Sequence, residues 1–282
     1  MSAVPLPEPE LAIPWDFGTE PQRRPLAAPA AEPAPLRAEP PPAPVVAPHI
    51  PADTREKLVL GPDMPQPVVE QYRQLAATLH SLQRDDAIKT VMVTSAVPHE
   101  GKTLVAANLA LVLATSFRRR VLLIDGDLRR PSLHSVLGVP NVGGLADCLD
   151  GERGRAPAPI QVAPRVSLLV AGTPQTDPMR IVTGAGMQKL LAESAGAYDW
   201  VVLDSPPVAI LPDGHLLAAM VDRALLVIQA ARTPYDAIQK AIDTIGRERI
   251  LGAVLNRAED IHVTPYGGGY GYYSYAPREA GE

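Results

Sequence analysis

The chain has 282 residues and a mass of 30.0 kDa, which suits one sizeable α/β domain with extensions. Its formal net charge of -5 argues against nucleic acid as a partner, because binding to a phosphate backbone usually needs a basic surface. Cys148 is the single cysteine, so an internal disulfide is excluded and a zinc site built from several cysteines is disfavoured. Cys148 itself is expected to be a small buried apolar residue.

Residues 1–57 are expected to be disordered. Fifteen of the 32 prolines lie between Pro5 and Pro51. Proline fixes φ and removes a backbone donor, so neither helix nor sheet is expected to propagate through this segment. Two roles stay open for it: a spacer, or a docking arm for a partner with Trp15 and Phe17 as anchors.

The sequence does not predict a membrane-embedded protein. Its apolar stretches fall short of the ~18 residues that a spanning helix needs. The opening residues MSAVPLPEPE lack the basic segment and the apolar core of a secretory signal. We therefore expect a cytoplasmic protein.

Residues 58–262 have the pattern of a folded domain. Residues 67–83 carry apolar side chains at helical spacing. Short apolar runs then alternate with helical segments, and the runs occupy residues 91–95, 121–125, 166–172, 200–204, 224–230 and 250–256. Near-continuous apolar runs are typical of strands buried on both faces of a parallel sheet. The alternation predicts a three-layer α/β/α fold with a mostly parallel sheet.

The last segment, residues 263–282, is expected to be a flexible tail. Its mixture of glycine and tyrosine cannot bury a core. Five of the eight tyrosines of the chain gather in it: Tyr266, Tyr270, Tyr272, Tyr273 and Tyr275.

A phosphate-binding loop is predicted after the run 91–95. The sequence AVPHEGKT follows an apolar strand and opens a helix, which is the context of a Walker A motif. Backbone N–H groups of such a loop point at phosphates, Lys102 supplies a cation, and the Thr103 hydroxyl can bind Mg²⁺. ATP and Mg²⁺ are the predicted ligands, and the loop residues expected to hold the nucleotide are Ala96, Val97, Pro98, His99, Glu100, Gly101, Lys102, Thr103 and Leu104.

Two further motifs place carboxylates at the ends of apolar runs. Asp125 and Asp127 are two residues apart, which puts both on the same side of an extended chain. Asp204 ends another run and precedes two prolines, as a Walker B aspartate that holds Mg²⁺ would. Carboxylates beside phosphates need a cation or a proton between them, and Mg²⁺ and a substrate hydroxyl are the candidates.

Together the motifs TSAVPHEGKT, VLLIDGDLRRPSLH and VVLDSPP resemble the BY-kinases, the bacterial tyrosine kinases of capsule and exopolysaccharide export. That family lies within the P-loop superfamily of MinD-like and ParA-like proteins. The resemblance covers residues 58–258 and includes the stretches at 145–151 and 171–182. It implies an ATP-dependent autokinase that phosphorylates its own C-terminal tyrosine cluster.

The resemblance also implies residue roles and partners. Lys102, Asp125 and Asp127 would be catalytic, and Thr103, Asp125 and Asp204 would bind Mg²⁺. Asn256, in GAVLNR, would recognise the adenine. The family also implies self-association into an oligomer. A membrane polysaccharide co-polymerase would activate the kinase and recruit it to the inner face of the membrane.

The sequence departs from the family pattern at two places. The family loop usually has glycine where this chain has His99, whose side chain would crowd the phosphate or force an unfavourable φ. The assembly helix of the family carries Glu-x-x-Arg-x-x-Arg, and here Glu70 and Arg73 are followed by Ala76, which weakens the case for an oligomer.

Three functions are therefore compared: a tyrosine autokinase, a catalytically weak nucleotide-sensing scaffold of an export complex, and a partitioning ATPase. Partitioning ATPases carry an extra lysine early in the loop, at the position of Val97, so the sequence disfavours them. Arg129 has two open roles, as a structural residue or as one that faces the phosphates.

Overall fold

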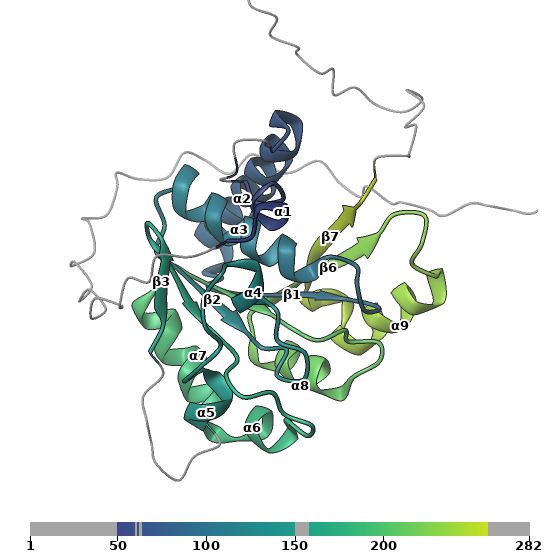
Figure 1. Cartoon of the computed structure of the whole chain (residues 1–282). Coiled ribbons are helices and arrows are strands. Elements are labelled where there is room, and N and C mark those ends of the chain that lie inside the picture. The colour runs from purple at the N-terminus through teal and green to yellow at the C-terminus, as the bar shows by residue number, and fades with distance from the viewer. Residues whose placement is uncertain (1–49, 60, 62–63, 150–157, 259–282) are drawn as a thin grey trace, which may run out of the picture. The chain divides into compact units, whose positions relative to one another are not determined.

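A seven-stranded sheet with the order β3-β4-β2-β5-β1-β6-β7 forms the centre of the structure (Figure 1). The structure is a computed structural model, and it describes residues 50–59, 61, 64–149 and 158–258. The strands are β1 Thr90–Ser95, β2 Val121–Asp125, β3 Ile160–Ala163, β4 Val166–Leu169, β5 Trp200–Asp204, β6 Arg223–Gln229 and β7 Ile250–Asn256. Within these residues every neighbouring pair is parallel except β3 and β4, so the expected mostly parallel sheet is confirmed.

Three details of the sheet differ from the sequence-based expectation. The antiparallel edge strand β3 was not expected, because its partly buried run of four residues is too short to give a pattern. The run 166–172 is a strand only to Leu169, because the carbonyls of Val170 and Ala171 accept backbone hydrogen bonds from the start of α5 instead. β7 is not buried on both faces, because it is the other edge strand, and its Leu255 is 55% exposed.

Helices cover both faces of the sheet and give the expected three layers. On one face α3 packs between the sheet and α2, and its residues from Val105 to Ala114 are all buried. The apolar side chains of α6 to α9 pack on the other face, and buried Cys148 of α5 confirms the expectation for the single cysteine. The helices are α1 Ala52–Arg55, α2 Gln66–Asp86, α3 Lys102–Ser116, α4 Leu133–Val136, α5 Leu145–Leu149, α6 Met179–Thr183, α7 Ala185–Ala197, α8 Pro212–Met220 and α9 Tyr235–Ile245, with a 3-10 turn at Arg247–Arg249.

The segment before α2 is ordered further towards the N-terminus than its composition suggests. Disorder was expected through residue 57, and this is wrong for residues 50–57, which include α1. The physical reason is an anchor: Leu58 is 2% exposed in the core, and the backbone on either side of it is bonded to the side chain of Asn108. Residues 1–49 and the predicted tail 263–282 lie outside the described residues.

The helix α2 shows why the family pattern Glu-x-x-Arg-x-x-Arg is incomplete here. Glu70 and Arg73 are exposed and form an ion pair at 3.4 Å on the helix surface. Ala76 instead has no exposed surface and packs in the core that α2 and α3 share. An arginine at that position would have to bury its charge. Among the described helices, none is both long and apolar enough to span a bilayer.

We predict that Ala76→Arg lowers the free energy of unfolding by more than about 3 kcal/mol, because it overpacks the core and buries an unpaired charge. Ala77→Arg is the matched control, because Ala77 is exposed on the same helix. It should change the free energy of unfolding by less than about 0.5 kcal/mol. Denaturant titration measures both, and equal stability of the two variants would contradict the packing of α2 on α3.

Candidate nucleotide-binding site

The three sequence motifs converge at one edge of the sheet. β2, β5 and β1 are neighbours and run parallel, so their carboxyl ends lie side by side. The loop from Ala96 to Gly101 follows β1, and Asp125 and Asp204 are the last residues of β2 and β5. Ligands of open α/β sheets bind at such an edge.

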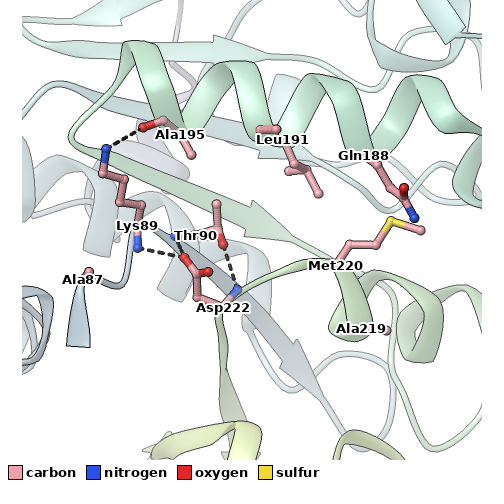
Figure 2. A pocket seen from close by; sticks show the side chains of 10 residues that line it. Ala87, Lys89, Thr90, Gln188, Leu191, Ala195, Ala219, Met220 and Asp222 are labelled. Carbon is pink, nitrogen blue, oxygen red and sulfur yellow. Dashed lines mark hydrogen bonds between the residues drawn. The ribbon is translucent and has the colours of Figure 1, made fainter. Parts of the chain in front are cut away.

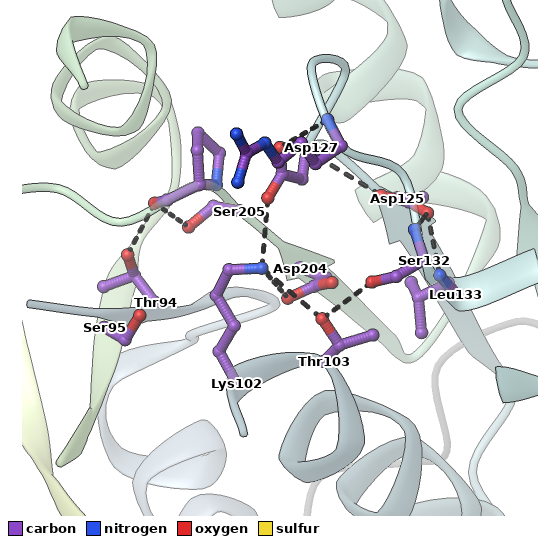
Figure 3. Close-up of polar contacts among 12 residues, drawn as sticks. Thr94, Ser95, Lys102, Thr103, Asp125, Asp127, Ser132, Leu133, Asp204 and Ser205 are labelled. Atoms are coloured by element: carbon purple, nitrogen blue, oxygen red, sulfur yellow. Dashed lines mark hydrogen bonds and ion pairs between the residues drawn. The ribbon is translucent and has the colours of Figure 1, made fainter. Parts of the chain in front are cut away.

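Lys102, the first residue of α3, lies at the centre of this convergence (Figure 3). Its ammonium nitrogen is 3.1 Å from Oδ2 of Asp127 and 3.8 Å from Oδ1 of Asp204. Burial lowers the pKa of Lys102, but the charges of Asp204 and Asp127 outweigh burial and raise this pKa above its ordinary value. Lys102 is therefore a permanent cation on the floor of the site.

Asp125 and Asp127 have different partners, although they are close in sequence. Asp125 is fully buried, and its carboxylate accepts hydrogen bonds from the backbone N–H groups of Asp127, Ser132 and Leu133. The carboxylate of Asp127 contacts Lys102 and accepts the N–H of Arg130 at 3.1 Å. The expected placement on one side concerned an extended chain, whereas β2 ends at Asp125 and Asp127 follows outside the strand.

Asp204 is a buried carboxylate with an incomplete set of partners. Neither of its oxygens has a hydrogen bond of normal geometry among the described residues, although the Thr103 hydroxyl is near enough to lower its pKa. Burial is the larger effect and raises the pKa of Asp204 to about 6. Burial and the charge of Asp204 also raise the pKa of Asp125, to about 8.

These features fit a divalent cation at Asp204 and Thr103. A buried carboxylate without hydrogen-bond partners is stabilised by a cation, and Mg²⁺ is usually held by one or two protein oxygens together with phosphates and water. Accordingly, the described residues contain no cluster of three acidic, histidine or cysteine side chains that would form a complete metal cage. Asp125 is less available as a ligand, because backbone N–H groups already occupy its carboxylate.

Two side chains brace the loop from behind rather than facing a ligand. Glu100 is 1% exposed, and its carboxylate accepts hydrogen bonds from the Val97 N–H and from the Thr233 hydroxyl. The side-chain amide of Asn256 donates to the carbonyl of Glu100 at 2.8 Å. Glu100 and Asn256, both predicted to contact the nucleotide, therefore hold the loop with their side chains, and Ala96 is fully buried.

His99 adopts a left-handed backbone conformation, which is the unfavourable φ that was expected at this position. Its φ is 66°, a region that costs most side chains about 1 kcal/mol or more. His99 is exposed, and it is one of the residues that line the cavity described below. Gly101 also has a positive φ of 91°, and there a Cβ atom would collide with the amide of Asn256. Glycine is thus required at position 101 and only favoured at position 99.

The motifs open onto a cavity of about 730 Å³ that is rich in cations. Its basic lining residues are Lys57, Lys102, Arg129, Arg130 and Arg257. Asp127 is the single acidic side chain among the described residues that line it. Pro98, Pro207, Ile210 and Leu211 form an apolar part of the wall. Such a surface suits a polyanion that also carries an apolar group.

The contacts of Arg129 favour a structural role for this residue. Its guanidinium forms a two-point ion pair with Asp213 of α8 and also donates to the carbonyl of Thr176. Asp213 is 1% exposed, so Arg129 provides the counter-charge of a buried carboxylate. Arg129 also lines the cavity, but its guanidinium is already engaged.

Sequence reasoning missed several residues that the fold brings to the site. The Ser132 hydroxyl lies 3.1 Å from that of Thr103, and Ser132 lines the cavity. Lys57 and Arg257 line it from opposite ends of the domain sequence. The serine stands inside the motif LRRPSLH and was open to prediction, whereas the two basic residues carry no local signal.

A second hollow of about 420 Å³ lies at the opposite edge of the sheet, by the first residues of β1 and β6 (Figure 2). Its polar groups are bonded to one another. The N–H groups of Lys89 and Thr90 both donate to the carboxylate of Asp222 at 2.8 Å, and the Lys89 ammonium donates to the carbonyl of Ala195. This hollow offers little to a ligand and is not the functional site.

Comparison with known proteins places the chain among kinases. No protein-family model matches the chain. It is 34% identical over 191 residues to "Tyrosine-protein kinase YwqD" of Bacillus subtilis (strain 168), which covers 66% of this chain and 80% of that protein. It is 31% identical over 213 residues to "Putative tyrosine-protein kinase EpsB" of Ralstonia nicotianae, which covers 74% of this chain but 28% of EpsB. It is 28% identical over 197 residues to "Succinoglycan biosynthesis transport protein ExoP" of Rhizobium meliloti, covering 67% of this chain and 25% of ExoP.

Solved structures of kinase domains and related ATPases are similar to this chain. The chimerical protein CapA2B2 superposes with a TM-score of 0.66 at 25% identity, covering 76% of this chain and 94% of that chain. The kinase domain of Escherichia coli tyrosine kinase ETK gives 0.62 at 29% identity, covering 72% and 80%. The cell division ATPase MinD of Pyrococcus furiosus gives 0.52 at 26% identity, covering 62% and 74%. The expected P-loop fold related to MinD is thereby confirmed.

We predict that His99→Gly changes the affinity for Mg-ADP by less than tenfold, because the imidazole is exposed and only the backbone is strained. The same change should raise the free energy of unfolding by about 1 kcal/mol. Arg118→Gly is the matched control, since Arg118 has a φ of 53° and is exposed outside the cavity. Calorimetry measures the affinity, and a gain of more than tenfold for His99→Gly alone would show that the ring obstructs the site.

Proposed function

The chain belongs to the family of bacterial tyrosine-protein kinases, and we propose that it transfers the γ-phosphoryl group of ATP to tyrosine hydroxyls. The observation that carries this proposal is the position of Lys102. It lies between Asp127 and Asp204 on the floor of a cation-lined cavity. This arrangement provides a cation for phosphates and a carboxylate for an acceptor hydroxyl in one place.

The basic residues bind and polarise the triphosphate. Lys102 would contact the β- and γ-phosphate oxygens and stabilise the charge that develops as the bond between the γ-phosphorus and the β-γ bridging oxygen breaks. Backbone N–H groups of the loop before α3 would hold the remaining phosphate oxygens. Asn256 would place the nucleotide through its bond to the loop, and the proposed adenine contact rests on the resemblance.

Thr103 and Asp204 would hold Mg²⁺. When bound, this ion neutralises phosphate charge and aligns the reacting groups. Asp204 provides a buried carboxylate, and Thr103 provides a hydroxyl that already points towards Ser132. Asp125 supports the site by fixing the backbone of residues 127–133, and its role as a direct ligand remains a proposal from the resemblance.

Asp127 is the best-placed base for the acceptor. It is the acidic side chain on the cavity wall, whereas Asp125 and Asp204 have no exposed surface. The tyrosine phenol would give its proton to Asp127 as the phenolic oxygen forms its bond to the γ-phosphorus, and ADP leaves with the bridging oxygen. We therefore propose different roles for the two aspartates of the motif: Asp127 would accept the proton, and Asp125 would position it.

The tyrosine cluster of residues 266–275 is the proposed acceptor. Among the described tyrosines, Tyr198 is 9% exposed and Tyr72 has a pKa raised by burial, so neither hydroxyl is well presented. Tyr235 is 74% exposed and is the competing candidate. A chain of about 15 residues can extend roughly 50 Å, so the tail can reach a site on the same or a second copy.

The biological setting is proposed from the relatives. ExoP is named for succinoglycan biosynthesis and transport, which favours a role in exopolysaccharide synthesis or export. The chain spans about a quarter of ExoP and EpsB. We propose that a membrane co-polymerase activates it and brings it to the inner face of the membrane. Self-association through the exposed Glu70 and Arg73 remains a proposal, because these two residues also form an ion pair with each other within α2.

Two other functions compete less well. A scaffold that binds nucleotide without transfer would need His99 to block the site, and His99 is exposed at the wall of the open cavity. A partitioning ATPase would carry a lysine at position 97, and Val97 stands there. Similarity to MinD concerns the fold that both groups share.

We predict that Lys102→Met abolishes phosphotyrosine formation from radiolabelled ATP, because it removes the cation on the phosphates. The far-ultraviolet circular dichroism spectrum should stay unchanged. Lys189→Met, on the exposed surface of α7, is the matched control and should keep full activity. Undiminished phosphorylation in Lys102→Met would mean that this loop is not the phosphate site.

We predict that deletion of residues 263–282 removes most of the phosphotyrosine while Mg-ADP binds with unchanged affinity. Mapping of the full chain by mass spectrometry should place the phosphate on the tail tyrosines. Tyr235→Phe in the full chain serves as the control and should leave the total nearly unchanged. Phosphate found mainly on Tyr235 would rule out the tail as the substrate while keeping the kinase assignment.

A further inference from the structure

We propose that residues 50–59 form a strap along one wall of the nucleotide cavity, with Lys57 as a ligand for the polyphosphate and Asn108 as its latch. This inference rests on the proposed nucleotide site. It gives a function to a segment that the sequence placed in a disordered extension. Thr54 and Lys57 line the same cavity as Lys102 and Thr103, although they precede those residues by more than forty positions.

The latch is a buried amide that is hydrogen-bonded through both its nitrogen and its oxygen. Asn108 is 1% exposed on α3, and its Nδ2 donates to the carbonyl of Lys57 at 3.0 Å. Its Oδ1 accepts the N–H of Val59 at 2.9 Å. Leu58, between these two bonds, is 2% exposed in the core. A polar side chain in an otherwise apolar helix is costly unless it is bonded, so the strap is what makes Asn108 tolerable there.

The latch and the phosphate loop belong to one rigid element. Asn108 lies six residues after Lys102 on α3, a rise of about 9 Å. The carbonyl that Asn108 holds is that of Lys57 itself, so the backbone of Lys57 is fixed relative to Lys102. The same helix thus sets the positions of two lysines that line the cavity from different segments.

The ammonium group of Lys57 is suited to bind an anion. Among the described residues it forms no ion pair, whereas Lys102 and Arg129, which line the same cavity, are both engaged with carboxylates. A lysine ammonium offers three donors and no acceptor, so it suits phosphate oxygens rather than the mixed donors and acceptors of a base. Lys57 is therefore, like Arg130 and Arg257, a cation of the cavity lining with no carboxylate partner among the described residues, and it can bind phosphate.

Titration calorimetry with Mg-ADP on the full chain tests the proposal. Lys57→Ala should weaken binding roughly tenfold, in line with the loss of one charge-assisted contact. Lys57→Arg should restore binding to within about threefold, since the charge is kept. Lys240→Ala, which removes an exposed lysine of α9 outside the cavity, should bind as the parent does. Equal affinity of Lys57→Ala and the parent would overturn the strap and leave the kinase proposal standing.

Single and double variants of Asn108 and Lys57 test whether Asn108 acts by positioning Lys57. Asn108→Ala should weaken Mg-ADP binding to a similar extent, and the double variant with Lys57→Ala should be no weaker than either single one, because Asn108 acts by placing Lys57. Additive losses would overturn the latch.

Trypsin provides a readout on the parent protein should Asn108→Ala not fold. Mg-ADP should slow cleavage after Lys57, and cleavage unaffected by Mg-ADP in a protein that binds it would overturn the strap. Absence of Mg-ADP binding in the parent would instead overturn the proposed function.

Discussion

The burial of three carboxylates around one ammonium group is the constraint on which this site depends. Asp125, Asp127 and Asp204 lie at the ends of neighbouring strands or just after them, and Lys102 is the cation between the last two. Desolvation of these carboxylates is expensive, and with Lys102 as the cation between two of them the pKa values of Asp125 and Asp204 are raised. A further cation would favour the charged carboxylates at the centre of the site. A rim of cations surrounds it, so the edge of the sheet is complementary to a metal ion carried by a polyphosphate.

The same constraint links nucleotide binding to stability. The pKa of Asp125 rises to about 8 and that of Asp204 to about 6, from an ordinary value of 3.8, chiefly through burial. The folded state then binds protons more tightly than the unfolded chain, so stability decreases as the pH rises from about 4 towards 8. A divalent cation bound at Asp204, as proposed above, would offset this loss. Because such a ligand binds the folded state alone, it raises the free energy of unfolding by mass action.

Local patterns made the strands, the loop and the aspartates predictable, and they failed where tertiary contacts decide. The runs that form β1, β2, β5, β6 and β7 are apolar and bounded, so their sequence suffices. Helical spacing places Ala76, but not Ala77, on one face with Val69 and Leu79, yet only the fold shows that this face packs against α3. The order of residues 50–59 likewise depends on Asn108, some fifty positions away. The separate partners of Asp125 and Asp127 depend on where β2 ends, which no spacing rule gives.

The loop before α3 shows how the fold keeps a strained backbone in place. His99 and Gly101 both have positive φ, a conformation that the chain would leave if the loop were free. Glu100, between them, is tied to Val97 and Thr233 by its side chain and to Asn256 by its carbonyl. These bonds come from β7 and from the turn after β6, so one side of the sheet determines the shape of the loop. Asp127 and Asp204, which engage Lys102, come from the other side. In the proposed function, a phosphate group entering the loop would meet N–H groups that are already oriented, and little reorganisation would be left for the transfer step.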